Sequence, residues 1–293
     1  MRKGTDNMAS LTIGLIQTRM SEDRRENRER AAGKIQEAAG RGARIVCLPE
    51  LYNTLYFPQT PRGRAGHLAE SIPGESTAFF SPLAKALGIV LIVPLFEKGS
   101  DGRFYSAAAV IDADGRLLES YRKVHIPQDP LFYEQDYFVP GNRGYRVYRT
   151  GHGTFAVLIC YDQWFPEAAR HCALEGADLI FYPTAVGWIR DQEAEEGDWH
   201  NAWETIQRAH AIANGIHVAA VNRVGEEGRL RFWGNSFVSD AFGNVLDRAG
   251  NQEEAVLVVS CDLARNKAVQ EGWGFLRNRR PDTYGRLTDP NRP

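Results

Sequence analysis

Short apolar runs alternate along the chain with longer stretches in which apolar and charged residues are mixed. The apolar runs are rich in Val, Ile and Phe and are bounded by Gly, Asp or Pro, a pattern typical of β-strands. This pattern predicts strands at residues 12–17, 45–48, 90–96, 107–112, 155–160, 179–184, 217–222, 235–239 and 255–261.

The mixed stretches predict helices at about residues 21–40, 75–87, 166–175 and 199–214, each ending on or near a glycine, as helices often do. Two segments, 111–117 and 239–245, turn on a glycine and predict hairpins. Helices, strands and hairpins together indicate an α/β fold with mixed sheets and helices on the outer faces. The two halves repeat these elements in a similar order without a low-complexity linker, which suggests one domain built as a pseudo-twofold sandwich.

Composition narrows the class of protein. The chain has 293 residues, of which 43% are hydrophobic and 25% charged, and its formal net charge is −2. This balance is ordinary for a globular protein and argues against a dedicated nucleic-acid binder. The first ten residues lack the apolar segment of a signal peptide, and the apolar runs fall far short of the ~20 residues that span a membrane. We therefore expect a cytoplasmic protein with a flexible leader at 1–9, in which Met8 is an alternative start.

The chain has four cysteines, scattered without a CxxC pair, which indicates free thiols with neither a disulfide framework nor a zinc site. Cys160 stands at the end of the predicted strand 155–160, where a strand-to-helix turn can expose a nucleophile. The alternative is that Cys160 is a small buried residue that closes the strand.

A carboxylate and an ammonium elsewhere in the chain favour the reactive interpretation. Glu50 follows the apolar strand 45–48, where a buried charge needs either an ion-pair partner or a chemical role. Lys123 follows a predicted hairpin and, taken alone, is equally consistent with a surface charge. Together, a carboxylate could accept the proton of a thiol while an ammonium stabilises the thiolate and the oxyanion that forms on a substrate.

Four motifs contain these residues: LPE ending at Glu50, RKVHIP around Lys123, FYEQDYFVPG around Glu134 and ICYDQWFPEAAR around Cys160. With them, the sequence resembles the nitrilase superfamily of carbon–nitrogen hydrolases over nearly its whole length. Within this superfamily, DQWFPEAAR, YFPQ and FYPTAVG are most similar to N-carbamoylputrescine amidohydrolases.

The resemblance implies a four-layer α-β-β-α sandwich, which we place at residues 10–275 as a single domain. It also implies a homodimer or higher homo-oligomer, in which a C-terminal arm at 276–293 packs on a neighbouring subunit. The chemistry of the family requires neither a metal ion nor an organic cofactor, and the only other partner expected is a small-molecule substrate.

The resemblance also implies roles for individual residues. Cys160 corresponds to the nucleophile, Glu50 to the general base and later acid, and Lys123 to the oxyanion stabiliser. Glu134 corresponds to a second glutamate that orients the lysine and the substrate, and the backbone N–H of Tyr161 completes the oxyanion hole. The expected substrate-binding residues are Tyr56, Tyr133, Asp162, Trp164 and Trp188, and His125 is expected beside the site, where a structural role is equally consistent.

The residues after the nucleophile bear on the substrate tail. Relatives that hydrolyse N-carbamoyl amino acids use an arginine there to hold the substrate carboxylate, whereas this chain has Asp162-Gln163-Trp164. An amine tail needs carboxylates or aromatic faces, which Tyr52, Tyr56, Trp188 and the acidic loop Asp191, Glu193, Glu195, Glu196 and Asp198 could supply, unless this loop is only a solvated one. Carbamoylputrescine enzymes tend to have an acid shortly after the position of Gly187, where this chain has Ile189, so either a nearby loop acid substitutes for it or the substrate differs.

We therefore predict cysteine-dependent hydrolysis of an amide or ureido C–N bond, with N-carbamoylputrescine as the leading substrate. The expected products are putrescine, carbon dioxide and ammonia, as in polyamine biosynthesis. An ω-amidase, or an amidase for another small ureido compound, is the enzymatic alternative. A catalytically silent binding protein on the same scaffold is an alternative of another class, against which the intact Glu50, Lys123 and Cys160 count.

Overall fold

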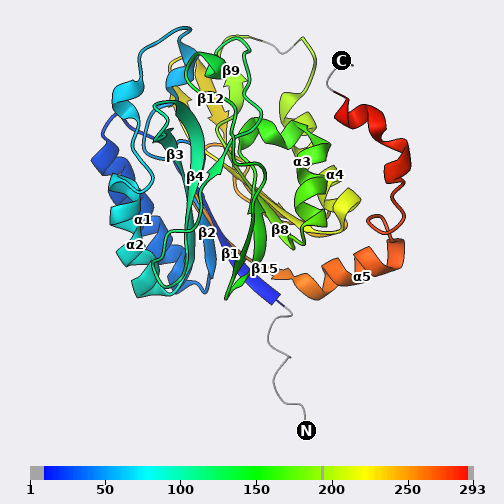
Figure 1. The fold of residues 1–293 in the computed structure, drawn as a ribbon. Helices are drawn as coiled ribbons and strands as arrows, with labels where there is room; N and C mark the ends of the chain where they lie inside the picture. The colour runs from blue at the N-terminus through cyan, green and yellow to red at the C-terminus, as the bar shows by residue number, and fades with distance from the viewer. Residues whose placement is uncertain (1–9, 193–194, 290–293) are drawn as a thin grey trace.

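The computed structural model describes residues 10–192 and 195–289 (Figure 1). Two six-stranded sheets form its centre. The first contains β1 (Ser10–Gln17), β2 (Ile45–Cys47), β3 (Val90–Lys98), β4 (Phe104–Ile111), β5 (Tyr121–Arg122) and β15 (Ala255–Asp262), in the order β15-β1-β2-β3-β4-β5. The second contains β6 (Val147–Thr150), β7 (Gly153–Val157), β8 (Leu179–Thr184), β10 (His217–Asn222), β13 (Phe237–Ser239) and β14 (Val245–Arg248), in the order β14-β13-β10-β8-β7-β6.

Helices cover the outer face of each sheet. In Figure 1, α1 (Arg24–Gly40) and α2 (Glu75–Leu87) lie on the left beside the first sheet, and α3 (Pro166–Leu174) and α4 (Trp199–Asn214) lie on the right beside the second. Contacts of α1 with β1, of α2 with β3 and of α4 with β10 agree with this view. The four-layer α-β-β-α sandwich expected from the sequence is confirmed.

The two sheets repeat one pairing pattern. From β15 to β5 the neighbouring strands pair antiparallel, parallel, parallel, antiparallel and antiparallel. From β6 to β14 the second sheet follows the same sequence of pairings. The order of the elements along the two halves therefore does produce an internal pseudo-twofold arrangement.

The main core lies between the sheets, where side chains such as Leu15, Ile92 and Phe181 are completely buried in one apolar cluster. A second cluster, including Ile35 of α1 and Phe80 of α2, fills the layer between the first sheet and its helices. Because the first sheet is covered on both faces, β3 is apolar on both faces, with eight buried positions out of nine. This explains why 90–96 reads as a continuous apolar run.

The structure corrects several strand boundaries, the one before Cys160 among them, and adds elements that the sequence pattern did not indicate. The predicted strand 155–160 ends at Val157, because after Leu158 bonds to the carbonyl of Phe181 the backbone turns into the short 3₁₀ helix η4 (Cys160–Trp164). Helix α5 (Leu263–Trp273) was also missed. So was a small third sheet of β9 (Gly187–Ile189), β11 (Val224–Glu227) and β12 (Leu230–Trp233), whose strands are too short to show a pattern.

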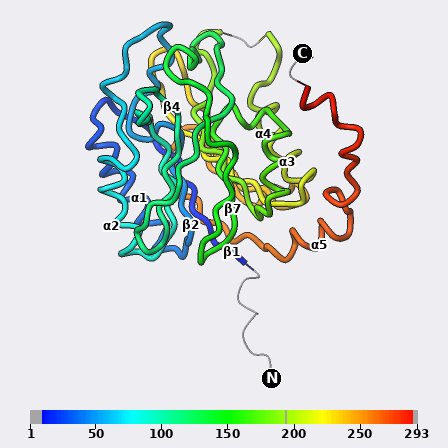
Figure 2. Tube along the Cα trace, in the orientation of Figure 1, coloured from blue at the N-terminus to red at the C-terminus, as the bar shows by residue number. Residues whose placement is uncertain are grey.

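The ends of the chain bear on two expectations. The leader at 1–9 lies outside the described residues. The described part of the C-terminal arm lines a cavity with Arg170 of α3 and His210 of α4, in agreement with its course beside these helices in Figure 2 (red). Its packing on a neighbouring subunit stays a prediction. Within the described ranges, no helix is long and apolar enough to cross a membrane.

Candidate active site

Glu50 lies in a turn that follows β2 and is completely buried. Its Oε1 atom accepts hydrogen bonds from the Lys123 ammonium, at 2.9 Å, and from the Ser106 hydroxyl of β4, at 3.1 Å. Its Oε2 atom is also buried and has no hydrogen-bond partner among the described residues. One side of this carboxylate is therefore fixed, while the other is free to accept a proton.

Lys123 joins the two buried glutamates. It directly follows β5, is completely buried, and donates to Glu50 and to Oε2 of Glu134, the latter at 2.5 Å. Burial works against the charge of Lys123, but Glu134 and Glu50 outweigh it and raise the pKa of the lysine above its ordinary value. Lys123 is therefore a permanent cation that can stabilise negative charge on a substrate oxygen.

Glu134 opens the short 3₁₀ helix η3 (Glu134–Asp136) and faces the lysine from the other side. The Tyr56 hydroxyl donates to its Oε1 atom at 2.7 Å. Burial raises the pKa of Glu134 to about 7, against the opposing effect of the Lys123 cation. Glu134 and Glu50 thus share one cation, which fixes the position of the ammonium between them.

Cys160 is the first residue of η4 and has a φ of 46°, a left-handed conformation that is costly for a residue with a side chain. Burial, followed by the nearby Glu50 carboxylate, raises the pKa of the Cys160 thiol well above its ordinary value, and the Lys123 cation only partly offsets this. As expected from the sequence, the cation favours the thiolate by lowering the thiol pKa, but burial and Glu50 outweigh it and favour a neutral thiol. Attack by Cys160 therefore requires a base, and Glu50 is the neighbouring group able to act as one.

Tyr161 follows the cysteine at the beginning of η4. Because the first N–H groups of a helix have no carbonyl partner within it, the Tyr161 N–H is suited to bind an oxyanion beside Cys160. Tyr161 also lines the cavity that contains Cys160.

Asp162 has a different place from the one predicted. It is completely buried and does not line the cavity; its Oδ2 accepts from the Tyr121 hydroxyl and the Ile159 N–H, and its Oδ1 accepts from the His125 N–H. The Nδ1 atom of His125 also lies 2.7 Å from Oδ1. Because His125 is near Lys123 in the chain and Asp162 is near Cys160, Asp162 joins these two segments and lies outside the described cavity lining.

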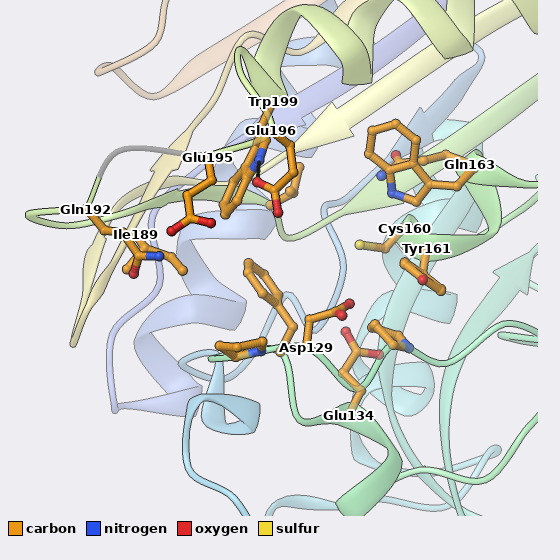
Figure 3. Close-up of a pocket in the computed structure, with 15 residues that line it drawn as sticks. Asp129, Glu134, Cys160, Tyr161, Gln163, Ile189, Gln192, Glu195, Glu196 and Trp199 are labelled. Atoms are coloured by element: carbon orange, nitrogen blue, oxygen red, sulfur yellow. Dashed lines mark hydrogen bonds between the residues drawn. The ribbon is translucent and has the colours of Figure 1, made fainter.

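A cavity of about 420 Å³ is lined by Cys160, Tyr161 and Glu134 (Figure 3), whereas Glu50 and Lys123 are not among its described lining residues. In this view Cys160 and Tyr161 lie at one side, Gln192 and Glu195 lie at the other, and Asp129 lies between them. The apolar and aromatic part of the lining consists of Pro127, Pro130, Phe132, Trp164, Val186, Ile189 and Trp199. The polar part consists of Asp129, Glu134, Cys160, Tyr161, Gln163, Gln192, Glu195 and Glu196.

Only Trp164 of the five predicted substrate-binding residues lines this cavity. Tyr56 is buried and held by Glu134, and Trp188 packs on Trp233 at 5.3 Å between ring centroids. Tyr133 bonds through its backbone to Pro58. The structure thus places these three side chains, like Asp162, away from the described cavity wall, and motif resemblance could not have shown this.

The lining includes residues that the sequence pattern did not indicate, notably Asp129, Phe132 and Trp199. Asp129 lies between Lys123 and Glu134 in the chain, so its place between two catalytic motifs was an available signal. Glu195, Glu196 and Ile189 were noted from the sequence and do line the cavity, whereas Glu193 lies outside the described residues. In the described part of the chain, no group of three or more His, Cys, Asp or Glu side chains is placed to hold a metal ion.

Comparison with known proteins identifies the family. The family described as "Carbon-nitrogen hydrolase" matches residues 12–271. The chain belongs to the carbon–nitrogen hydrolases, the nitrilase superfamily. This confirms the family that the four motifs of the sequence resembled.

Curated relatives of this carbon–nitrogen hydrolase include enzymes for different ureido compounds. The N-carbamoylputrescine amidase of Solanum lycopersicum is 39% identical over 284 residues, covering 94% of this chain and 93% of the relative. The citrullinase of Francisella tularensis is 34% identical over 285 residues, covering 96% and 99%.

Two solved structures extend the comparison. A carbon–nitrogen hydrolase of Helicobacter pylori G27 is 39% identical, with a TM-score of 0.91 and coverage of 96% of this chain and 99% of that one. An amidase of Nesterenkonia sp. AN1 is 26% identical, with a TM-score of 0.75 and coverage of 96% and 98%. A mutant of that amidase was solved with the acetamide moiety of fluoroacetamide added at its active-site cysteine.

Proposed function

We propose that this carbon–nitrogen hydrolase cleaves the ureido bond of N-carbamoylputrescine and releases putrescine, carbon dioxide and ammonia. The proposal has two parts, the reaction at Cys160 and the selection of an amine tail. The observation that carries the second part is the charge of the cavity. Its described lining contains the carboxylates of Asp129, Glu134, Glu195 and Glu196 and no lysine or arginine.

The first half-reaction uses the buried groups around Cys160. The thiol sulfur attacks the ureido carbon while Glu50 takes the thiol proton on its unpartnered Oε2 atom. The oxyanion of the tetrahedral intermediate is stabilised by the Lys123 ammonium and the Tyr161 N–H. The intermediate collapses, the C–N bond to the terminal nitrogen breaks, and ammonia leaves with the proton returned by Glu50.

The second half-reaction regenerates the thiol. Glu50 removes a proton from water, which attacks the S-carbamoyl carbon, and the Cys160 thiolate leaves and recovers a proton from Glu50. The product is an N-substituted carbamic acid, which decomposes to carbon dioxide and the free amine. Every proton transfer in this sequence is made by Glu50, so no further acid or base is needed.

The cavity supports an amine tail at the end away from the thiol. An alkyl chain that extends from Cys160 passes the apolar and aromatic side chains of the lining, including Trp164 and Ile189. A terminal ammonium then meets Glu195, Glu196 or Asp129, whose charges are opposite to its own. Glu196 accepts from the Trp199 indole N–H, 3.0 Å from its Oε2 atom, and a hydrogen bond to its own backbone N–H, followed by this one, lowers the pKa of Glu196.

The same charges count against substrates with a carboxylate tail. A buried or half-buried carboxylate is usually held by arginine or lysine, and the described cavity wall supplies neither. An uncharged ω-amide is the stronger alternative, because Ile189, Phe132 and Val186 give the cavity an apolar surface. The two candidates differ in whether the tail carries a positive charge.

Three ureido compounds of equal chain length separate these candidates. Ammonia release is measured with an amine tail (N-carbamoylputrescine), a methyl tail and a carboxylate tail. We expect kcat/KM to be highest for the amine tail, by at least about tenfold over the methyl tail, and lowest for the carboxylate tail. Preference for the methyl or the carboxylate tail would reject the polyamine assignment while leaving the cysteine chemistry intact.

A further inference from the structure

Arg223 is a completely buried arginine that the proposed reaction does not use. It follows β10 and precedes β11, so it lies where the second large sheet joins the small third sheet. Its guanidinium lies over the ring of Phe232, 5.2 Å from the centroid, and pairs with the buried carboxylate of Glu227 at 2.8 Å. A buried guanidinium is costly unless its donors find acceptors, so the position of those acceptors shows what it holds.

Most of these acceptors belong to the turn that carries the general base. The Nη2 atom of Arg223 donates to the backbone carbonyls of Glu50, at 2.7 Å, and Leu51, at 2.8 Å. Its Nη1 atom donates to the carbonyl of Thr54 at 3.2 Å. One guanidinium therefore spans the turn from residue 50 to residue 54.

The turn needs this support, because Leu51 has a φ of 50°. This left-handed conformation costs roughly 1–2 kcal/mol for a residue with a side chain and persists only where the surroundings impose it. The two hydrogen bonds from Nη2 hold the carbonyls that precede and follow the Leu51 Cα atom, those of Glu50 and Leu51. Arg223 thus fixes the part of the turn that is least stable by itself.

Glu227 extends the same contact to the second catalytic glutamate. Its Oε2 atom accepts from the backbone N–H of Tyr56 at 2.5 Å, and the hydroxyl of Tyr56 donates to Glu134. Arg223 acts on the backbone of Glu50 directly, and Glu227 acts on Glu134 through Tyr56. The ion pair is therefore linked to both carboxylates that hold the Lys123 ammonium.

We propose that Arg223 is a positioning residue for the general base. With Glu227, it holds the 50–56 backbone so that the carboxylates of Glu50 and Glu134 keep their spacing around Lys123 and Cys160. A displacement of about 1 Å at such a site can reduce a rate by ~100-fold without altering the contacts that bind substrate. The inference rests on the proposed cysteine chemistry and is independent of the substrate tail.

The test replaces Arg223 by lysine, which keeps the positive charge but cannot form the same fork of donors. We expect Arg223→Lys to fold, with kcat at least about tenfold lower and KM within about twofold of the unmodified protein. The control is Arg248→Lys, because Arg248 also holds a carboxylate, through its Nη2 atom at 2.7 and 2.6 Å from the two oxygens of Glu204, outside the catalytic network. Equal losses in both variants, or an unchanged kcat in a folded Arg223→Lys, would overturn the proposal.

A second measurement does not need the natural substrate. Iodoacetamide alkylates Cys160 with loss of iodide once the thiol proton is removed, so its rate reports the action of Glu50 on the thiol. The alkylation rate of Glu50→Gln sets the lower limit. We expect the alkylation rate of Arg223→Lys to be much closer to this limit than to the rate of the unmodified protein. If the protein proves inactive on ureido compounds but shows this pattern, the positioning role stands although the proposed substrate does not.

Glu227→Gln provides a variant of unchanged shape in case Arg223→Lys does not fold. It leaves the guanidinium on the three carbonyls but weakens the anchor on the Tyr56 N–H. We expect at least about a threefold lower alkylation rate with an unaltered circular dichroism spectrum. A rate equal to that of the unmodified protein in this folded variant would contradict the proposal.

Discussion

The two ends of the cavity are built in different ways. At the reacting end, Glu50, Lys123 and Glu134 are completely buried and joined by hydrogen bonds of 2.5 to 2.9 Å. At the tail end, Glu195 and Glu196 are exposed and lie between β9 and α4 in the chain. Buried charges keep their geometry only with a full set of partners, whereas exposed charges can change with little cost to folding. This difference supports the proposal that the sandwich fixes the chemistry while a loop makes the choice of substrate.

Removal of the nucleophile should have the largest effect. Cys160→Ala is expected to reduce ammonia release by at least about 10⁴-fold, because no covalent intermediate can form. Cys172→Ala is the matched control, since Cys172 is an equally buried free cysteine in α3. Turnover that survives Cys160→Ala would exclude nucleophilic catalysis by this thiol.

Asp162 tests whether the segments of the reacting end depend on one another. Asp162→Asn keeps the size of the side chain but replaces one carboxylate oxygen with an NH₂ group. This group cannot accept the hydrogen bonds that the replaced oxygen accepts in the unmodified protein. We expect kcat to fall by roughly ten- to a hundredfold with KM little changed, together with a loss of about 1–3 kcal/mol in the free energy of unfolding. A rise in KM alone would instead support the prediction from the sequence that Asp162 contacts substrate directly.

The sequence was informative in different degrees about these two regions. Glu50, Lys123, Glu134 and Cys160 could be singled out because each stands at the end of an apolar strand or within a motif. The side chains around them could not, because burial and hydrogen bonding decide their contacts: Asp162 is adjacent to a cavity-lining residue in the chain yet turns into the core.

At the tail end of the cavity, the sequence predicted only an excess of acidic residues. Nothing in the loop 191–198 shows which of its acids face Cys160, since that depends on how β9 and α4 hold its ends. Asp129 was missed although its place between the motifs of Lys123 and Glu134 was a signal. Residue patterns predicted the sandwich well because a period of two or 3.6 repeats over many positions, whereas a loop has no period to detect.

The pKa of Glu134 gives a prediction about stability. Its value of about 7 lies above that of a carboxyl in an unfolded chain, near 4.3, so the folded state binds the proton more tightly. Stability from this group is therefore present below about pH 4 and is lost as the pH rises to about 7. In Glu134→Gln this component is absent, so the melting temperature of the variant minus that of the unmodified protein should rise by a few degrees between about pH 5 and 7.5.

A flat difference over that range would show that Glu134 is already ionised in the folded protein at the lower pH. Conversion to an amide also leaves one acceptor oxygen for the two donors Lys123 and Tyr56, which lowers the stability of the variant. The pH dependence of the difference, and not its absolute size, is thus the quantity that reports the pKa.

The most direct test of the division between the two ends uses the double variant Glu195→Gln/Glu196→Gln. Its kcat/KM is measured with N-carbamoylputrescine and with the methyl-tailed ureido analogue, and Asp191→Asn serves as a loop control because Asp191 does not line the cavity. We predict about a tenfold loss for the amine tail, no more than about a twofold change for the methyl tail, and no effect of the control. Equal losses on both substrates, or none on the amine, would contradict the assignment of substrate choice to this loop.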